Sequence, residues 1–141
     1  MIGKRIKYFR NLRGMTQREL GRRVGLSPLS ADVRIAQYES GSRNPKSEMI
    51  AAFANALNVS PAALTVPDVD NVTELMQILF ALEDRYKVRP IRIYGQVCLC
   101  IDDEGESAIT KVLEQWYEQT RRMKYDEITS EEYDRWRYNY H

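Results

Sequence analysis

The sequence predicts a mainly α-helical protein in two parts. Five short helices are expected in residues 1–66, followed by a linker at 67–71 and a small α+β part, with three helices and one β-hairpin, in 72–141. Two observations support this division. Capping and turn residues recur at short intervals in the first part, whereas the second contains one run of alternating β-branched residues between longer helical patterns. The polar, proline-containing connector VPDVDN separates them.

Helix boundaries in the first part are predicted from their end signals. Thr16-Gln-Arg-Glu19 is a capping box, in which each side chain accepts from the other residue's backbone amide. Gly41 follows the third helix, and Ser60 precedes a proline in the arrangement typical of a helix start. The five helices are expected at about residues 2–13, from 16 to near 25, up to 41, 46–57, and from 60.

Gly21 stands in the middle of the second helix, where glycine costs about 1 kcal/mol relative to alanine. A partner helix that crosses very closely would explain it, because only a small residue lets two backbones approach. Gly25 then supplies a turn before the third helix. A short helix, a glycine turn and a second helix form a helix-turn-helix, whose second helix enters the major groove of DNA.

The second part is predicted to start with a helix at residues 72–86. A hairpin follows around Tyr94-Gly95, then a long amphipathic helix at about 106–124 and a last helix with a capping box from Thr129. One hairpin and three helices bury little core by themselves, so we expect this part to form a dimer interface. The aromatic residues of the last helix are expected in a core or at an interface.

Charge is distributed unevenly along the chain. Residues 1–67 carry eleven Lys or Arg and four Asp or Glu, a net charge of +7, whereas residues 68–141 carry ten and sixteen, a net of −6. The basic part suits a polyanion such as DNA, because bound cations release the counterions that condense on phosphates. The sequence has no apolar run long enough to span a membrane and no signal peptide, so a soluble, cytoplasmic protein without membrane contact is expected.

Three stretches of the first half resemble the Cro/cI-type (XRE) helix-turn-helix regulators. They are IGKRIKYFRNLRGMTQREL, QYESGSRNP and ALNVSPAAL, and together the resemblance covers about residues 2–66. It implies a five-helix, lambda-repressor-like DNA-binding domain with a recognition helix as its third helix. It also implies that the whole chain is a sequence-specific transcriptional regulator, with a repressor acting as a dimer on a palindromic operator as the leading form.

The resemblance assigns expected roles to individual residues. Those that match base-reading positions are Asp32, Val33, Arg34 and Gln37. Those that match contacts to the DNA backbone are Gln17, Ser40, Ser42, Arg43 and Asn44. Arg10 and Glu39 match a partly buried ion pair, which we interpret as structural because unpairing a buried charge costs several kcal/mol.

The chain departs from the family pattern between Gly25 and Ile35, where it holds four additional residues. Aligned backward from Ile35, residues 32–34 occupy the base-reading positions; aligned forward from Gly25, residues 28–30 do. A helix start at Ser27 would lengthen the recognition helix by about one turn, or ~6 Å. A start at Ser30 would leave a longer turn, in which Leu29 would fold down onto the second helix. We favour the longer turn, because an extended helix would collide with the groove floor.

No catalytic set is expected. The one histidine, His141, is the last residue, and no motif for a nucleophile, a phosphate loop, a metal or a cofactor is present. Cys98 and Cys100 are half of a metal site at most, and we interpret them as small buried strand residues. Two alternatives remain for the C-terminal half: it binds a protein partner, as in an antitoxin that represses its own gene, or it senses a small effector.

Overall fold

A computed structural model of the chain describes residues 2–102 and 107–140. His141 and the expected start of the long helix at residue 106 lie outside the described residues. Contacts between residues divide the chain into two compact units. The first holds the residues up to Pro67 together with those from Asp134 onward, and the second is Asp68–Tyr133.

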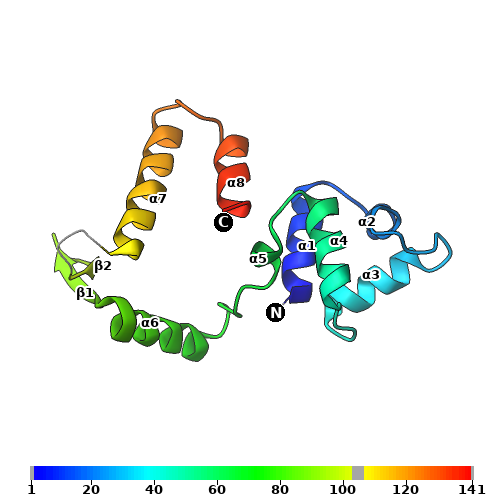
Figure 1. Ribbon diagram of the computed structural model, residues 1–141, viewed down its shortest axis with the longest axis horizontal. Coiled ribbons are helices and arrows are strands. Elements are labelled where there is room, and N and C mark those ends of the chain that lie inside the picture. Colours follow the sequence, from blue (N-terminus) through cyan, green and yellow to red (C-terminus); the bar gives the residue numbers. More distant parts are fainter. Residues whose placement is uncertain (1, 103–106, 141) are drawn as a thin grey trace. The chain divides into compact units, whose positions relative to one another are not determined.

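The first unit is built on five helices that surround one hydrophobic core (Figure 1). These helices are α1 (Ile2–Leu12), α2 (Gln17–Arg23), α3 (Ala31–Ser40), α4 (Ser47–Leu57) and α5 (Pro61–Leu64). Their apolar faces meet at side chains that are fully buried, among them Ile6, Phe9, Leu20, Ile35, Phe53, Leu57 and Leu64. The predicted five-helix arrangement is confirmed, as is the mainly α fold with a small α+β part after it.

The predicted helix ends are also confirmed. Thr16 accepts a hydrogen bond from the Glu19 amide at 3.1 Å, and the Glu19 carboxylate accepts from the Thr16 amide at 2.7 Å. These bonds hold the pKa of Glu19 below its ordinary value. Ser60 accepts from the Ala63 amide at 3.3 Å, and Gly41 ends α3 in the left-handed conformation with φ 79°.

Helix α3, the expected recognition helix, begins at Ala31, with Ser30 at the N-cap position, so the chain uses the longer of the two predicted turns. The Ser30 side chain makes no capping hydrogen bond. Our expectation that Leu29 folds onto α2 is wrong, because Leu29 is 95% exposed. Leu26, before Leu29, and Ala31, after it, are buried in the core. Leu29 therefore lies on an exposed turn between two buried residues.

Helices α2 and α3 cross so closely that the crossing point admits only glycine. A Cβ atom added to Gly21 would lie 2.6 Å from the Cβ of Ala31, well inside van der Waals contact. The predicted reason for a glycine in the middle of α2 is therefore confirmed. A second close approach was not predicted: a Cβ on Gly3 of α1 would lie 2.3 Å from the carbonyl oxygen of Tyr38. The two glycines fix where α3 lies against α1 and α2.

The second unit contains α6 (Val72–Tyr86), β1 (Val88–Ile93), β2 (Gln96–Ile101) and α7 (Ala108–Lys124) (Figure 1). The two strands pair antiparallel, with Val88 opposite Ile101 and Ile93 opposite Gln96. Tyr94 and Gly95 both have positive φ and form the predicted two-residue turn. Helix α8 (Ser130–Tyr138) follows, and the unit boundary falls within it.

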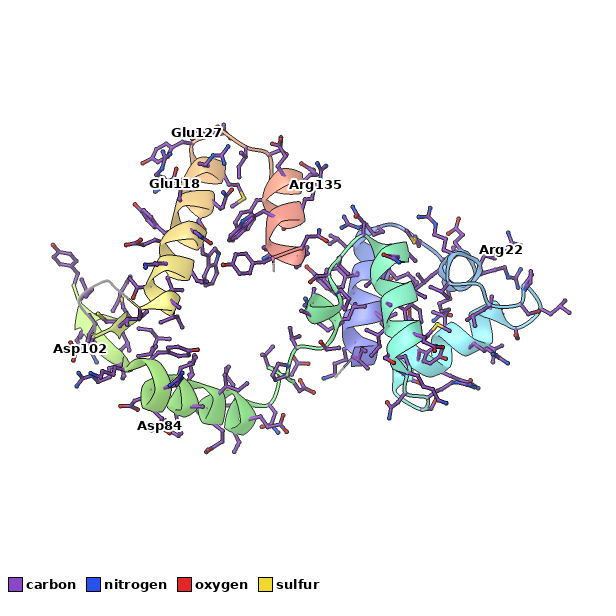
Figure 2. All side chains as sticks on the ribbon, in the orientation of Figure 1. Arg22, Asp84, Asp102, Glu118, Glu127 and Arg135 are labelled. Atoms are coloured by element: carbon purple, nitrogen blue, oxygen red, sulfur yellow. The ribbon has the colours of Figure 1, made fainter. Side chains whose placement is uncertain are left out.

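Little of the second unit is buried. Among its described residues, Val88 and Tyr133 alone are classed as buried. The expectation of buried cysteines is wrong, because Cys98 is half-buried and Cys100 is exposed on the hairpin. Ion pairs lie mainly on the surface. For example, Glu118 and Glu127, labelled in Figure 2, both pair with Arg121 near the end of α7.

The end of α8 completes the core of the first unit. The Tyr138 ring packs edge-on against Phe9, with 4.7 Å between ring centroids, and its hydroxyl lies 2.9 Å from that of Tyr8. The Tyr138 carbonyl accepts from the Ser60 amide at 2.9 Å. These contacts of Tyr138 group the last residues of the chain with the N-terminal helices.

Candidate nucleic-acid interface

Helix α3 has one buried and one exposed face. Ile35 and Tyr38 point into the core, and on the opposite face Val33, Arg34 and Gln37 are exposed at the three- and four-residue spacing of a helical stripe. The structure therefore brings together three of the four residues predicted to contact bases. Their side chains are carried on a helix whose other face is locked in the core, which limits how far they can move relative to α2.

The fourth predicted base-reading residue, Asp32, lies in the first turn of α3 and is engaged by other groups. Its carboxylate accepts from Arg18 of α2 at 3.2 Å. A hydrogen bond from the Val33 backbone amide, reinforced by Arg18, lowers the pKa of Asp32. Asp32 thus joins the two helices of the helix-turn-helix. Arg18 was not identified from the sequence, because no local spacing links it to a residue fourteen positions later.

An ion pair ties α1 to α3. Arg10 donates to the Glu39 carboxylate from Nε at 2.5 Å and from a terminal nitrogen at 3.1 Å, and the two side chains are 12% and 4% exposed. Gln17, at the start of α2, donates to the same carboxylate at 2.9 Å. These three side chains hold the first three helices together beneath the exposed stripe of α3.

The loop after α3 is organised around the Gln37 carbonyl oxygen. The hydroxyls of Ser40 and Ser42 both donate to it, at 3.1 and 3.2 Å, and the Arg43 amide does so at 3.1 Å. Arg43 and Asn44 line a surface hollow of about 380 Å³, in which the Arg43 guanidinium lies 5.7 Å from the centre of the Tyr38 ring. The serines therefore shape the loop, while Arg43 and Asn44 are presented at the surface.

Exposed cations flank this region. They come from α2, from α3 and from the loop after it, and they are Arg18, Arg22, Arg23, Arg34, Arg43 and Lys46. Figure 2 labels Arg22, which extends from α2 away from the core. Asp32, one of the few acidic groups here, is already paired. The electrostatics of these helices therefore favour a polyanion.

Two closely crossing helices, with a stripe of exposed side chains on the second and cations around it, define a helix-turn-helix DNA-binding domain. Residues 6–64 match the family model described as Helix-turn-helix. This part of the chain belongs to that family, the XRE-type domains of Cro/cI regulators, as the resemblance predicted. The matched domain thus supports a DNA-binding transcription regulator.

No curated protein matches the chain significantly. Among the described residues, no helix combines the length and the apolar character needed to cross a membrane.

Proposed function

We propose that the protein is a transcriptional repressor that binds a palindromic operator as a homodimer, with α3 of each copy in the major groove. The observation that carries this proposal is the exposed stripe of α3 on a helix locked to its neighbours. Side chains that select a DNA sequence must be held in a fixed position, because a bidentate hydrogen bond to a base edge tolerates little movement.

Arg34 and Gln37 are the proposed base-reading residues. Arginine pairs bidentately with the O6 and N7 of guanine, and glutamine pairs with the N6 and N7 of adenine. The two side chains are exposed and stand on adjacent turns of α3. Val33 presents an apolar surface beside them, whereas Asp32 is held by Arg18 and is assigned to positioning α3.

Contacts to the DNA backbone are proposed for Arg43 and Asn44, which are exposed beside the end of α3. Gln17 keeps a second amide hydrogen for a phosphate while its first is used by Glu39. Ser40 and Ser42 would have to turn their hydroxyls away from the Gln37 carbonyl oxygen to donate to DNA. Arg43 is therefore the principal phosphate contact in this proposal.

Selection of bound sequences from a random DNA pool tests these assignments. Arg34→Ala and Gln37→Ala should weaken binding to the selected operator by roughly fivefold or more, since a bidentate pair is worth about 1–3 kcal/mol, and should leave random DNA nearly unaffected. Arg43→Ala should weaken binding to both DNAs. It should also reduce the slope of the logarithm of the binding constant against the logarithm of the salt concentration by about one. Equal losses on both DNAs for Arg34→Ala and Gln37→Ala would contradict the assignment to bases.

Dimerisation is proposed through the second unit. An apolar groove of about 300 Å³ runs between α6 and the hairpin. Its lining includes exposed or half-exposed Phe80, Val97 and Leu99. A two-stranded sheet with open edges and an uncovered apolar surface is marginal in water by itself, and a second copy would cover both.

Sedimentation equilibrium of the full chain tests the dimer. Wild-type protein should be dimeric at micromolar concentration, and Leu99→Lys, which places a charge in the groove, should shift it toward monomer. Tyr94→Lys is the matched control, because Tyr94 is fully exposed at the hairpin turn and does not line the groove. A wild-type chain that stays monomeric over the whole concentration range would refute the proposal.

Repression would follow from occupancy alone, because a dimer seated within a promoter blocks access to it. A reporter gene with the selected operator inside its promoter should be silenced by the wild-type protein and not by Arg34→Ala. Activation of the reporter would show that the protein is an activator and not a repressor. Relief of silencing by a co-expressed protein or a small molecule would point instead to the partner-binding or effector-sensing alternatives.

A further inference from the structure

The turn between α2 and α3 carries an apolar side chain that is left in solvent. Leu29 is 95% exposed and lies between Pro28, which is also exposed, and Ser30. Figure 1 shows the turn as a loop that stands out beyond the adjoining helix ends. One isolated leucine does not make the contiguous apolar patch that marks a protein interface, but it is large enough to cover a single methyl group.

The turn is held at both ends. Leu26 is buried, and its amide donates to the Gly21 carbonyl at 2.9 Å. The Ser30 amide closes the turn on the Ser27 carbonyl at 3.0 Å, and Ala31 is fully buried directly after it. Leu29 is therefore presented from a backbone that is ordered before any partner binds, which reduces the entropy lost on binding.

Leu29 lies at the end of α3 that meets base edges. In a helix-turn-helix complex the N-terminal residues of the recognition helix contact the bases. The first hydrogen bond of α3 runs from the Arg34 amide to the Ser30 carbonyl at 2.9 Å, so Leu29 directly precedes the first turn. Val33 and Arg34 follow on the exposed stripe. Thymine displays an apolar group in the major groove, the 5-methyl, and apolar side chains recognise it.

We propose that Leu29 is a specificity-determining residue that packs on the 5-methyl group of a thymine in each half-site of the operator. The inference rests on the proposed function, because it requires α3 to lie in the major groove. It adds a base contact from the lengthened turn, made by Leu29, which precedes Arg34 and Gln37 in the chain.

The test replaces thymine by uracil, which removes the methyl group and leaves the base-pairing edge unchanged. Full-length wild-type protein first selects an operator from a random pool. Each thymine of that operator is then replaced in turn, symmetrically in both half-sites, and binding is measured for wild type, Leu29→Ala and Val33→Ala. Because Leu29 is exposed, Leu29→Ala should keep the wild-type melting temperature. The uracil substitutions are also measured with the wild-type protein, so that part of the test requires no variant to fold.

We expect one thymine whose replacement weakens wild-type binding by about fourfold per half-site, the equivalent of one buried methyl group. Leu29→Ala should lose this difference, and Val33→Ala should keep it. Wild-type binding that is indifferent to uracil at every position overturns the inference alone, as does a Leu29→Ala protein with the wild-type uracil pattern. A wild-type protein that enriches no sequence overturns the proposed function, and the inference with it.

Discussion

Replacing Arg10 tests whether the Arg10–Glu39–Gln17 network contributes to stability as a buried ion pair does. The Glu39 carboxylate is 4% exposed and accepts two hydrogen bonds from Arg10 and one from Gln17. Arg10→Met leaves that charge with the Gln17 amide as its remaining side-chain donor in the described structure. Breaking a buried pair from one side costs about 3–5 kcal/mol, whereas an exposed pair contributes about 0.2–1 kcal/mol.

The expected loss corresponds to a fall in melting temperature of roughly 12 °C or more, because 1 kcal/mol shifts a domain of this size by about 4–8 °C. Thermal unfolding of the full chain, followed by circular dichroism, measures it. Arg18→Met is the matched control, because the Arg18–Asp32 pair is about half exposed on both sides. The double variant Arg10→Met with Glu39→Met should recover part of the loss, since it also removes the unpaired charge.

The reasoning would be refuted if Arg10→Met cost no more than Arg18→Met. It would also be refuted if the effects of Arg10→Met and Glu39→Met were additive, because side chains that stabilise each other must show a coupling energy.

Three further predictions follow from the packing of the first unit. Gly21→Ala should destabilise it by about 1–3 kcal/mol despite the better helix propensity of alanine, because the new Cβ would meet Ala31 at 2.6 Å; a variant as stable as wild type in urea would contradict the close crossing. Thr16→Ala should cost about 1 kcal/mol through loss of the α2 cap, and an unchanged urea midpoint would show that the cap contributes nothing. Burial and the Tyr8 hydroxyl raise the pKa of Tyr138 to about 12 from 10.0, so the stability that its neutral form provides is present below pH 10 and lost as pH rises toward 12. Tyr138→Phe should therefore flatten the fall of the urea midpoint over that window, and an identical fall in both proteins would argue against a buried phenol.

Much of the first unit was predictable because its signals are local. The Thr16 cap, the left-handed Gly41 and the Ser60 N-cap each depend on residues within one helical turn, so they appear in the sequence as short patterns. Gly21 indicated a close crossing without naming its partner. The partner, Ala31, follows only when both helices are placed.

The start of α3 could not be decided from sequence, since Ser27 and Ser30 both offer acceptable caps. Tertiary contacts decide it: Ala31 must reach Gly21, and Asp32 pairs with Arg18. With these contacts Leu29 is exposed to solvent, whereas we had expected it to be buried against α2.

The sequence by itself determined the helices of the DNA-binding part, because caps, turns and helical periodicity act over a few residues. The tertiary structure alone decided where α3 begins, which predicted residues share its exposed face, and that Tyr138 completes a core some 130 residues away in the chain. Contacts across such separations depend on how whole helices pack. No short pattern of residues records that packing.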